Sequence, residues 1–512
     1  MGKYVIAYDL GTGGNKASLY DVDGNCLAET FVPYATRYPA AGWHEQRPMD
    51  WWQAVVKSTN ELMTQANIDK NEIEALGISG QSLAVVPLDN NGNLLRESIP
   101  IWSDSRAYIQ AKTFFKKIAE PEWYLMTGNG FPAPLYAIFK IMWYRDNEPK
   151  MFDQIHKVIG SKDFINFTLT RQIVTDYSYA SGSGVYDLKG WKYSDKLIEA
   201  SGIRRELLPE IVPSSEIIGT ITSEAAKVLG LPTKIKVVAG GVDNSCMALG
   251  ARNIEEGRVY NSLGSSSWIA VSSEKPLLNQ RARPYVFTHV IPGLFTSAVS
   301  IFSAGSSFRW VRDQLCKNLL LEAEERKMDS YDFMTMLAAE VPIGARKLLF
   351  NPSLAGGTSL DDNPNIRGAF IGLDLGHTQA DIIRATIEGI TLNLRLALNE
   401  LRKLAKISRE MLIVGGGSSS KFWRQVCADV YNVNIVKTNI NQQAAALGAA
   451  ALAAVGTGLW HGFKKIDEIH RIEEIASPIA TNNKIYEQLL PIFAKAAKCQ
   501  AELGDMLAKL EI

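Results

Sequence analysis

Residues 4–26, YVIAYDLGTGGNKASLYDVDGNC, decide how the chain begins to fold. An apolar run carries Asp9 and continues directly into three glycines, Thr12 and Lys16. Glycines allow a tight turn and a close approach of backbone N–H groups, and a hydroxyl and a cation beside them suit a phosphate. The alternative is a plain hairpin turn in which glycine supplies a positive φ. This stretch alone leaves both interpretations open.

The same stretch predicts a three-stranded antiparallel meander over residues 3–10, 16–22 and 26–32. A similar order of elements recurs in residues 257–277, where an apolar run, a Gly/Ser turn around Gly264 and a second apolar run follow one another. We interpret the recurrence as two copies of one α/β unit. Chance similarity between two hairpins is the alternative.

Alternating strands and helices are expected after each meander. Apolar runs stopped by glycine predict strands at 75–80, 236–241 and 410–417. Helices are predicted at 50–66, 245–251, 381–405, 421–431, 443–455 and 483–510. The helix over 381–405 should bury one face, because its Ile and Leu residues recur every three or four positions beside charged ones. At 512 residues the chain is too long for one core, so we predict domains 1–245 and 246–512.

The composition excludes several kinds of partner. Lys+Arg and Asp+Glu both number 54, so neither nucleic acid nor a membrane surface is an expected partner. The most apolar run, residues 444–455, is shorter than the roughly 20 residues that span a bilayer, and it predicts a buried helix packed closely on a neighbour. Five scattered cysteines and no visible secretory signal favour a cytoplasmic protein.

Two further glycine-rich turns end predicted strands, where open α/β sheets bind ligands. KVVAGGVDNSCMALGA, residues 236–251, presents Asp243 at the start of a helix. Asp243 would either cap that helix or accept a proton from a hydroxyl group. LIVGGGSSSKFWRQVCADV, residues 412–430, approximates a dinucleotide fingerprint. However, Lys437 follows where that fold needs an acid, which disfavours an NAD(P) oxidoreductase.

Two aromatic stretches are candidates for sugar binding. WHEQRPMDWW (43–52) and IPIWSDSRA (99–107) combine indole rings with charged and amide side chains. Sugars are bound by apolar ring faces together with a few fixed polar groups, although core packing explains the tryptophans equally well. The six histidines show no metal-ligand spacing.

Taken in order, these motifs resemble the FGGY family of carbohydrate kinases over nearly the whole chain, and most of all its xylulose kinase branch. The matching stretches are DLGTGGNK, WHEQRPMDWW, GISGQ, WSDSRA, AGGVDN, NSLGSSS, VGGGSSSKFWRQVCADV and GAFIGLDLGHTQADIIRATIEG. They are similar to the family's phosphate, substrate, catalytic-aspartate and adenosine motifs and to its C-terminal signature. The resemblance implies an α/β fold of two RNase H-like domains, of the actin/hexokinase/Hsp70 type, with an interdomain cleft.

The resemblance also implies ATP and Mg²⁺ as cofactors and a role for each motif. Asp9 would hold Mg²⁺ and Asp243 would be the general base. The residues implied to contact ATP are Gly11, Thr12, Gly13, Lys16, Gly264, Ser265, Ser266, Gly305, Gly415, Gly416, Gly417 and Ser418. Those implied to contact the sugar are Gln81, Ser82, Trp102, Asp104, Arg106, Asp243 and Asn244.

The implied reaction is phosphorylation of a terminal hydroxyl of a small ketose. A pentulose such as D-xylulose is the first candidate substrate. Ser82-Leu83 stands where xylulose kinases have Met-His, and HVIPG with FRWVRDQLC looks more like the autoinducer-2 kinases of the same family. Alternatives are therefore an autoinducer-2-like substrate, a polyol or an aldonate. An alternative of another class is a nucleotide-driven ATPase or binding switch. The expected partner is a small-molecule sugar, and a homodimer is an alternative to a monomer.

Overall fold

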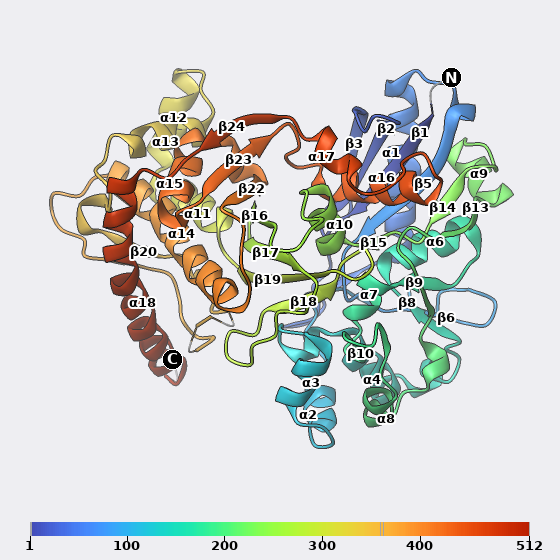
Figure 1. Ribbon diagram of the computed structural model, residues 1–512. Coiled ribbons are helices and arrows are strands. Elements are labelled where there is room, and N and C mark those ends of the chain that lie inside the picture. The colour runs from blue at the N-terminus through green and yellow to red at the C-terminus, as the bar shows by residue number, and fades with distance from the viewer. Residues whose placement is uncertain (1–2, 359, 362, 511–512) are drawn as a thin grey trace.

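The computed structural model describes residues 3–358, 360, 361 and 363–510, and it contains two seven-stranded sheets (Figure 1). The first sheet runs in the order β13-β14-β5-β1-β2-β3, with β15 also paired to β5. Its strands are β1 Tyr4–Leu10, β2 Gly14–Asp21, β3 Cys26–Pro33, β5 Ile73–Gly80, β13 Ile217–Thr220, β14 Lys236–Val238 and β15 Gly241–Val242.

The second sheet runs in the order β18-β19-β17-β16-β22-β23-β24. Its strands are β16 Val259–Leu263, β17 Ser267–Ser273, β18 Tyr285–Thr288, β19 Phe295–Ile301, β22 Glu410–Val414, β23 Asn434–Thr438 and β24 Ile472–Ala476. Short strands pair outside the two sheets: β4 Glu45–Gln46, β6 Val86–Leu88, β7 Ile99–Pro100, β8 Lys157–Ile159, β9 Val174–Asp176, β10 Tyr186–Asp187, β11 Lys192–Tyr193, β12 Glu210–Val212, β20 Leu349–Asn351 and β21 Ala369–Ile371.

Both sheets are built on the same plan, which confirms the predicted repeat. β1, β2 and β3 form an antiparallel meander, and β5 runs parallel to β1. In the second sheet, β16, β17 and β19 form the meander, and β22 runs parallel to β16. A further parallel strand follows in each copy, β14 beside β5 and β23 beside β22. The turns at the ends of equivalent strands therefore lie in equivalent places.

The predicted helices are present with small shifts at their ends. The helices of the structure are α1 Pro48–Ala66, α2 Tyr108–Phe114, α3 Glu120–Thr127, α4 Ala137–Asn147, α5 Pro149–Phe152, α6 Ser161–Thr170, α7 Tyr177–Ser181, α8 Asp195–Ser201, α9 Ser223–Leu229, α10 Asp243–Gly250, α11 Gly305–Leu315, α12 Lys317–Glu325, α13 Ser330–Ala339, α14 Gln379–Leu404, α15 Lys421–Tyr431, α16 Ala444–Gly456, α17 Lys465–Ile469 and α18 Ala480–Ala508. None of the helices among the described residues combines the length and apolarity needed to cross a membrane.

Helix α14 is more deeply buried than its sequence pattern predicts. The Ile and Leu residues of the expected apolar face are buried, but Arg384, Glu388 and Arg395 are buried as well. Arg384 pairs with Glu388, and the hydroxyl of Tyr486 donates to the same carboxylate. The prediction of a single buried face is wrong because distant segments supply partners for the charged side chains, which burial requires.

Helices α10 and α16 lie between the two sheets and pack on each other (Figure 1). Glycine makes this close packing possible: a Cβ at Gly250 would lie 1.8 Å from the carbonyl oxygen of Ala444, and one at Gly448 would lie 2.0 Å from that of Cys246. Helix α16 also covers β5, where a Cβ at Gly77 would meet the carbonyl oxygen of Ala449 at 2.1 Å. The predicted buried helix at 444–455 is confirmed, and it joins the two halves of the molecule.

A lobe that includes helices α2, α3, α4 and α8 is inserted in the sequence between β5 and β14 (Figure 1), whereas α6 and α9 pack on the first sheet. The lobe has an aromatic core of its own that includes Trp123, Phe139 and Tyr144. Val286 of β18 and Phe295 of β19 belong to the same core cluster, so the lobe also packs against the second half of the chain.

Candidate active site

A cavity of about 760 Å³ lies at the ends of strands of the second sheet. Its lining brings together three turns that are far apart in the sequence, and it includes Gly264, Ser265, Gly305, Gly415, Gly416 and Gly417. Ser418 is buried beside this wall, and its Oγ donates to the carbonyl oxygen of Gly415 (2.7 Å) and lies 3.0 Å from Oδ1 of Asn441. Most of the residues predicted to contact ATP in this half thus surround one space.

The turns of this wall are packed on one another. The Gly305 N–H donates to the carbonyl oxygen of Gly264 at 2.9 Å, and a Cβ at Gly305 would meet that oxygen at 2.5 Å. Gly415 has φ +93°, and its Cβ would lie 2.7 Å from the carbonyl oxygen of Leu263. By contrast, no described atom lies within 4 Å of a Cβ placed on Gly416. Glycine at 305 and 415 is needed by the protein itself, whereas glycine at 416 leaves space in the cavity.

The other part of the cavity wall is aromatic and charged, and Trp423 in it belongs to the stretch that resembles the adenosine motif. Phe308 and Trp423 line it with Tyr331, and their rings meet edge to face with centroids 5.3 Å apart. Arg309 and Asp332 also reach this wall. A space with glycine turns on one wall and flat rings on another fits a molecule that carries both phosphates and an aromatic base. Tyr331 and Asp332 lie where the sequence shows no recognisable motif.

The first glycine turn, between β1 and β2, faces the second half of the molecule. Lys16 lies opposite Asp9 in the β1–β2 pair, and its Nζ donates to the carbonyl oxygen of Gln442 at 3.1 Å. Gln442 lines the cavity. The turn and the cavity are therefore adjacent.

The turn joins two antiparallel strands as a hairpin, but the alternative in which its glycines supply a positive φ is wrong. Gly11 and Gly13 do not have positive φ, so their backbone conformation does not require glycine. A Cβ on Gly13 would have no described atom within 4 Å, and one on Gly11 would meet only the carbonyl oxygen of Gly14, at 3.6 Å. Side chains would fit at both positions in the isolated protein. Glycine here keeps space open beside the backbone, as a turn that receives a bulky anion requires.

Asp243 is the first residue of α10 and is half-buried. Val242 occupies the N-cap position, so the interpretation of Asp243 as a helix cap is wrong. The hydrogen bonds that the structure records for this carboxylate go to Oδ1, from the backbone N–H (2.8 Å) and side-chain amide (3.2 Å) of Asn244. Burial, with a smaller effect of the nearby Asp9, raises the pKa of Asp243 to about 7. Such a group can exchange a proton near neutral pH.

Asp9 lies close enough to Asp243 for their charges to interact. Its Oδ1 accepts a hydrogen bond from Ser79 Oγ of β5 at 2.9 Å. Burial raises the pKa of Asp9, while the Ser79 hydrogen bond and the charge of Lys16 act against that rise. Two neighbouring carboxylates beside an open turn can hold a cation and accept a proton.

Gln46 connects the first turn to the predicted sugar-binding segments. Its side-chain amide donates to the carbonyl oxygen of Thr12 at 2.8 Å, and its Oε1 accepts from Gln81 Nε2 at 2.7 Å. Trp102 Nε1 donates to the Thr12 hydroxyl at 2.8 Å. The structure therefore brings Thr12, Gln81 and Trp102 together, although they are separated in the sequence.

Ser82 and Leu83 are both buried, and Leu83 packs into the inserted lobe. Leu83 belongs to the aromatic core of the inserted lobe and has φ +61°, a conformation that bulky side chains rarely adopt. Its carbonyl oxygen accepts from Lys140 Nζ at 3.1 Å, and the same amine donates to the carbonyl oxygen of Ile101 at 2.6 Å. Burial lowers the pKa of Lys140 to about 7. Lys140 thus joins the two segments that contain Ser82 and Trp102.

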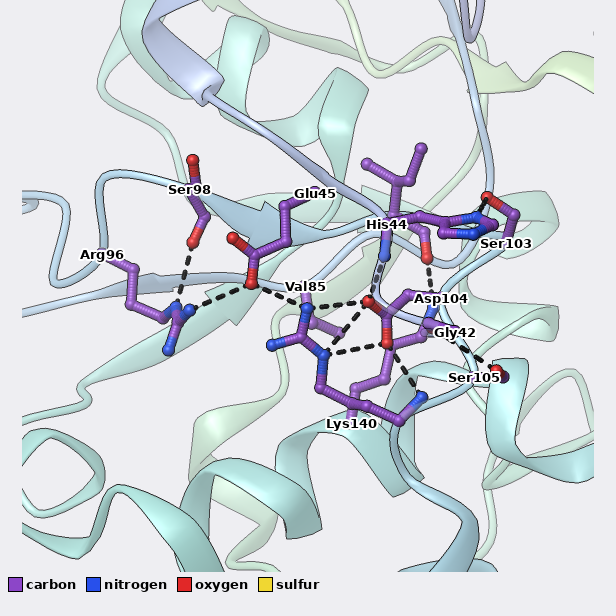
Figure 2. Close-up of polar contacts among 12 residues, drawn as sticks. Gly42, His44, Glu45, Val85, Arg96, Ser98, Ser103, Asp104, Ser105 and Lys140 are labelled. Carbon is purple, nitrogen blue, oxygen red and sulfur yellow. Dashed lines mark hydrogen bonds and ion pairs between the residues drawn. The ribbon is translucent and has the colours of Figure 1, made fainter. Parts of the chain in front are cut away.

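Asp104 and Arg106 lie in the protein interior. Asp104 is fully buried, and its carboxylate accepts from Arg106 Nε and from the His44 backbone N–H (2.7 Å). The Arg106 side chain also bonds to Glu45 at 2.7 Å and lies 3.9 Å over the Trp43 ring. Figure 2 shows Glu45 and Asp104 in this network, with Arg96 reaching Glu45 from the other side. This buried network adjoins Trp102 in the chain and holds the segment that contains it.

Two family models match most of the chain. The model of the FGGY family of carbohydrate kinases, N-terminal domain, matches residues 4–250, and the C-terminal domain model of the same family matches residues 259–457. The chain is similar to xylulose kinase of Bacillus subtilis (strain 168), with 30% identity over 496 residues, 96% of each chain.

Solved structures of the same family have closely similar folds. Xylulose kinase from Lactobacillus acidophilus superposes with a TM-score of 0.88 at 28% identity and covers 98% of both chains. Gluconate kinase from Lactobacillus acidophilus superposes equally well, with a TM-score of 0.88 at 28% identity, and covers 98% of this chain and 99% of its own. The predicted two-domain α/β fold of the actin/hexokinase type is confirmed.

Proposed function

Because the chain belongs to the FGGY family of carbohydrate kinases, we propose that it transfers the γ-phosphoryl group of ATP to a terminal hydroxyl of a small ketose, with D-xylulose as the first candidate. The observation that carries the proposal is that Asp9 lies close enough to Asp243 for their charges to interact and precedes a turn that contacts both Gln442 of the cavity wall, through Lys16, and Trp102, through Thr12. Phosphoryl transfer needs an aligned hydroxyl, neutralised charge and excluded water more than covalent help from the protein.

The residues at this position fit a magnesium nucleotide. Mg²⁺ is usually held by one or two carboxylates together with phosphate oxygens, and Asp9 offers one such carboxylate. Gly11, Gly13 and Gly416 leave open space on both sides, into which phosphates can approach. Bound at Asp9, Mg²⁺ would offset the negative charge of the phosphates.

In this proposal each half of the chain has its own task. Residues 1–245 bind the sugar: Gln81, Ser82, Trp102 and Asn244 position it, and Asp243 accepts the proton of the attacking hydroxyl at its carboxylate. Residues 246–512 bind the nucleotide. The proposed nucleotide contacts are Gly11, Thr12, Gly13 and Lys16 from the first half, and Gly264, Ser265, Ser266, Gly305, Gly415, Gly416, Gly417 and Ser418 from the second.

Two buried cations favour a neutral sugar over an aldonate. The side chains of Arg106 and Lys140 contact the predicted sugar segments, and both are buried and engaged, Arg106 with Asp104 and Glu45, Lys140 with backbone carbonyls. Arg106 Nη1 has no recorded hydrogen-bond partner, but the carboxylates of Asp104 and Glu45 already offset the charge of Arg106, which disfavours a further carboxylate beside it. The similarity to gluconate kinase makes an aldonate the second candidate. We also propose a cytoplasmic location, since all five cysteines are free thiols in the structure.

The proposal is tested by measuring ADP release with Mg·ATP and a panel of ketoses, polyols, gluconate and the autoinducer-2 precursor, with Asp243→Ala run beside the unsubstituted chain. We expect turnover with one ketose and its loss in Asp243→Ala. Turnover with gluconate instead would overturn the neutral-sugar assignment but keep the kinase. Steady ATP hydrolysis that no sugar changes would favour the nucleotide-driven switch.

A further inference from the structure

The loop that leads to Asp243, residues 239–242, is held by buried side chains of helices α6 and α7. The carbonyl oxygen of Ala239 accepts from Lys162 Nζ (3.1 Å) and from Asn166 Nδ2 (2.8 Å), both on α6. The N–H of Val242 donates to Ser178 Oγ on α7 at 2.9 Å. Lys162, Asn166 and Ser178 are all 0% exposed. Both ends of the loop are thus attached to two neighbouring helices, and Asp243 is the next residue.

Asp176 connects the two ends of this attachment. It is fully buried, and its Oδ1 lies 3.0 Å from Lys162 Nζ. Its Oδ2 accepts from both the backbone N–H and the hydroxyl of Ser178. A serine hydroxyl has one proton and two lone pairs, so the proton that Ser178 gives to Asp176 leaves a lone pair for the Val242 N–H. Asp176 therefore sets the direction in which Ser178 accepts.

The same two helices also hold the sugar segment. The carbonyl oxygen of Gln81 accepts from Ser161 Oγ of α6 at 2.7 Å and from the Tyr179 hydroxyl of α7 at 3.0 Å. Helices α6 and α7 therefore hold both Gln81, which is proposed to contact the sugar, and the loop before Asp243, which is proposed to accept the proton of the sugar. The distance between the sugar hydroxyl and the Asp243 carboxylate therefore depends on these two helices.

We propose that Ser178, oriented by Asp176 and Lys162, is a positioning residue that fixes the peptide of Val242 and thereby holds the Asp243 carboxylate in line with the substrate hydroxyl. This inference rests on the proposed role of Asp243 as the base. Buried ion pairs contribute little net stability, so the Lys162–Asp176 pair is better explained by the geometry that it imposes. A displacement of about 1 Å at a reacting group can reduce a rate by roughly 100-fold.

Ser214 provides a matched control. Its Oγ donates to the same Asp176 Oδ2 at 2.7 Å, and it is equally buried. Its contact with the loop is made by its backbone carbonyl oxygen, which accepts from the Gly240 N–H at 2.9 Å and which alanine retains. Ser178→Ala and Ser214→Ala therefore each remove one hydroxyl from Asp176, but only Ser178→Ala removes a partner of the loop.

The experiment measures kcat, KM for Mg·ATP, the melting temperature and amide hydrogen exchange of residues 239–245 in both variants. We expect Ser178→Ala to lower kcat about 10- to 100-fold with KM for Mg·ATP unchanged. Hydrogen exchange in the loop should become faster. Ser214→Ala should lower the melting temperature by about as much as Ser178→Ala does. Its kcat and its slow hydrogen exchange in the loop should stay as in the unsubstituted chain. Ser178→Cys keeps the side-chain volume with a weaker acceptor, so its kcat should lie between the two.

Equal kcat and equal loop exchange in Ser178→Ala and Ser214→Ala would overturn the inference. Asp243→Asn, run in parallel, separates this failure from failure of the proposed function. Normal sugar-dependent ADP production in Asp243→Asn would show that Asp243 is not the base. Hydrogen exchange still reports in that case whether Ser178 fixes the loop, because it does not depend on activity.

Discussion

The two halves of the molecule repeat one topology but carry different chemistry at equivalent turns. Where β1 passes into β2, Asp9 and Lys16 face each other across the strand pair. Where β16 passes into β17, Ser262 and Trp268 occupy the facing positions. The duplicated fold supplies the same kind of turn twice, and charged side chains are present in only one of the two.

The same contrast holds at the helices between the sheets. Asp243 begins α10 in the first half, whereas the segment before α16 in the second half presents the neutral side chains of Asn441 and Gln442 to the cavity. This distribution has an electrostatic reason. Phosphates already carry negative charge, so a carboxylate beside them raises the energy unless a cation intervenes, whereas a carboxylate beside a sugar hydroxyl can accept its proton.

The largest effect should come from removing the carboxylate that distinguishes the first half. Asp243→Asn keeps the size of the side chain and an oxygen for Asn244 but cannot accept the proton, so kcat should fall about 10²- to 10⁴-fold. ADP release at saturating sugar measures this. The melting temperature should not fall, since burial already disfavours the charged form. A large loss of folding together with activity would contradict the assignment.

Removing the cation of the first turn should have the next largest effect. Lys16→Met deletes a charge that lies opposite Asp9 and beside the cavity, and hydrogen bonds to charged groups are strong enough that kcat/KM for ATP should fall about 10- to 100-fold. Lys57→Met is the control, because Lys57 is exposed on α1 and its partner is Glu61 on the surface. Equal rates in the two variants would show that the charge of Lys16 does not act on the nucleotide.

The pH dependence should also reflect the first half alone. Burial and Asp9 raise the pKa of Asp243 from 3.8 to about 7, and a base acts in its ionised form, so kcat/KM should fall about tenfold per unit as the pH drops below 7. Stability should change in the opposite direction. The unfolded chain ionises this group first, so ionisation costs folded stability as the pH rises from 4 to 7.

Asp243→Asn lacks that group and provides the control for this pH effect. The melting temperature of Asp243→Asn minus that of the unsubstituted chain should therefore increase as the pH rises from 4 to 7. A constant difference between the two chains would show that the pKa of Asp243 is not raised.

The repeated topology and the turns could be predicted from the sequence because they depend on local features. Glycines after apolar runs end strands, and the order of strand, turn and strand recurs in the second half. The residues of the second half that were predicted to contact ATP lie mostly around one cavity for the same reason: each turn ends a strand, and equivalent strand ends meet at one edge of a sheet.

The environment of individual side chains could not be predicted, because it depends on distant segments. Asp104 and Arg106 stand beside Trp102 in one motif, yet Arg106 is buried against the rings of Trp43 and Trp143, which come from other parts of the chain. The support of the Asp243 loop by Ser178 depends likewise on a segment without a recognisable motif. A motif shows which residue types are present, and only the folded chain shows which of them reach the surface of the site.

The smallest effects should separate glycines that the fold requires from glycines that the ligand requires. Gly415→Ala places a residue at φ +93° with its Cβ 2.7 Å from the carbonyl oxygen of Leu263, a strain of about 1–3 kcal/mol, so both the melting temperature and the affinity for ATP should fall. The Cβ that Gly416→Ala adds would have no described atom within 4 Å. This substitution should therefore leave the melting temperature unchanged and raise only KM for ATP, by a few-fold. Gly13→Ala should behave like Gly416→Ala, because the first turn has the same open space. If Gly416→Ala and Gly13→Ala left KM for ATP unchanged, the open space at the two turns would not be occupied by nucleotide, and the equivalence of the two halves would be one of backbone shape alone.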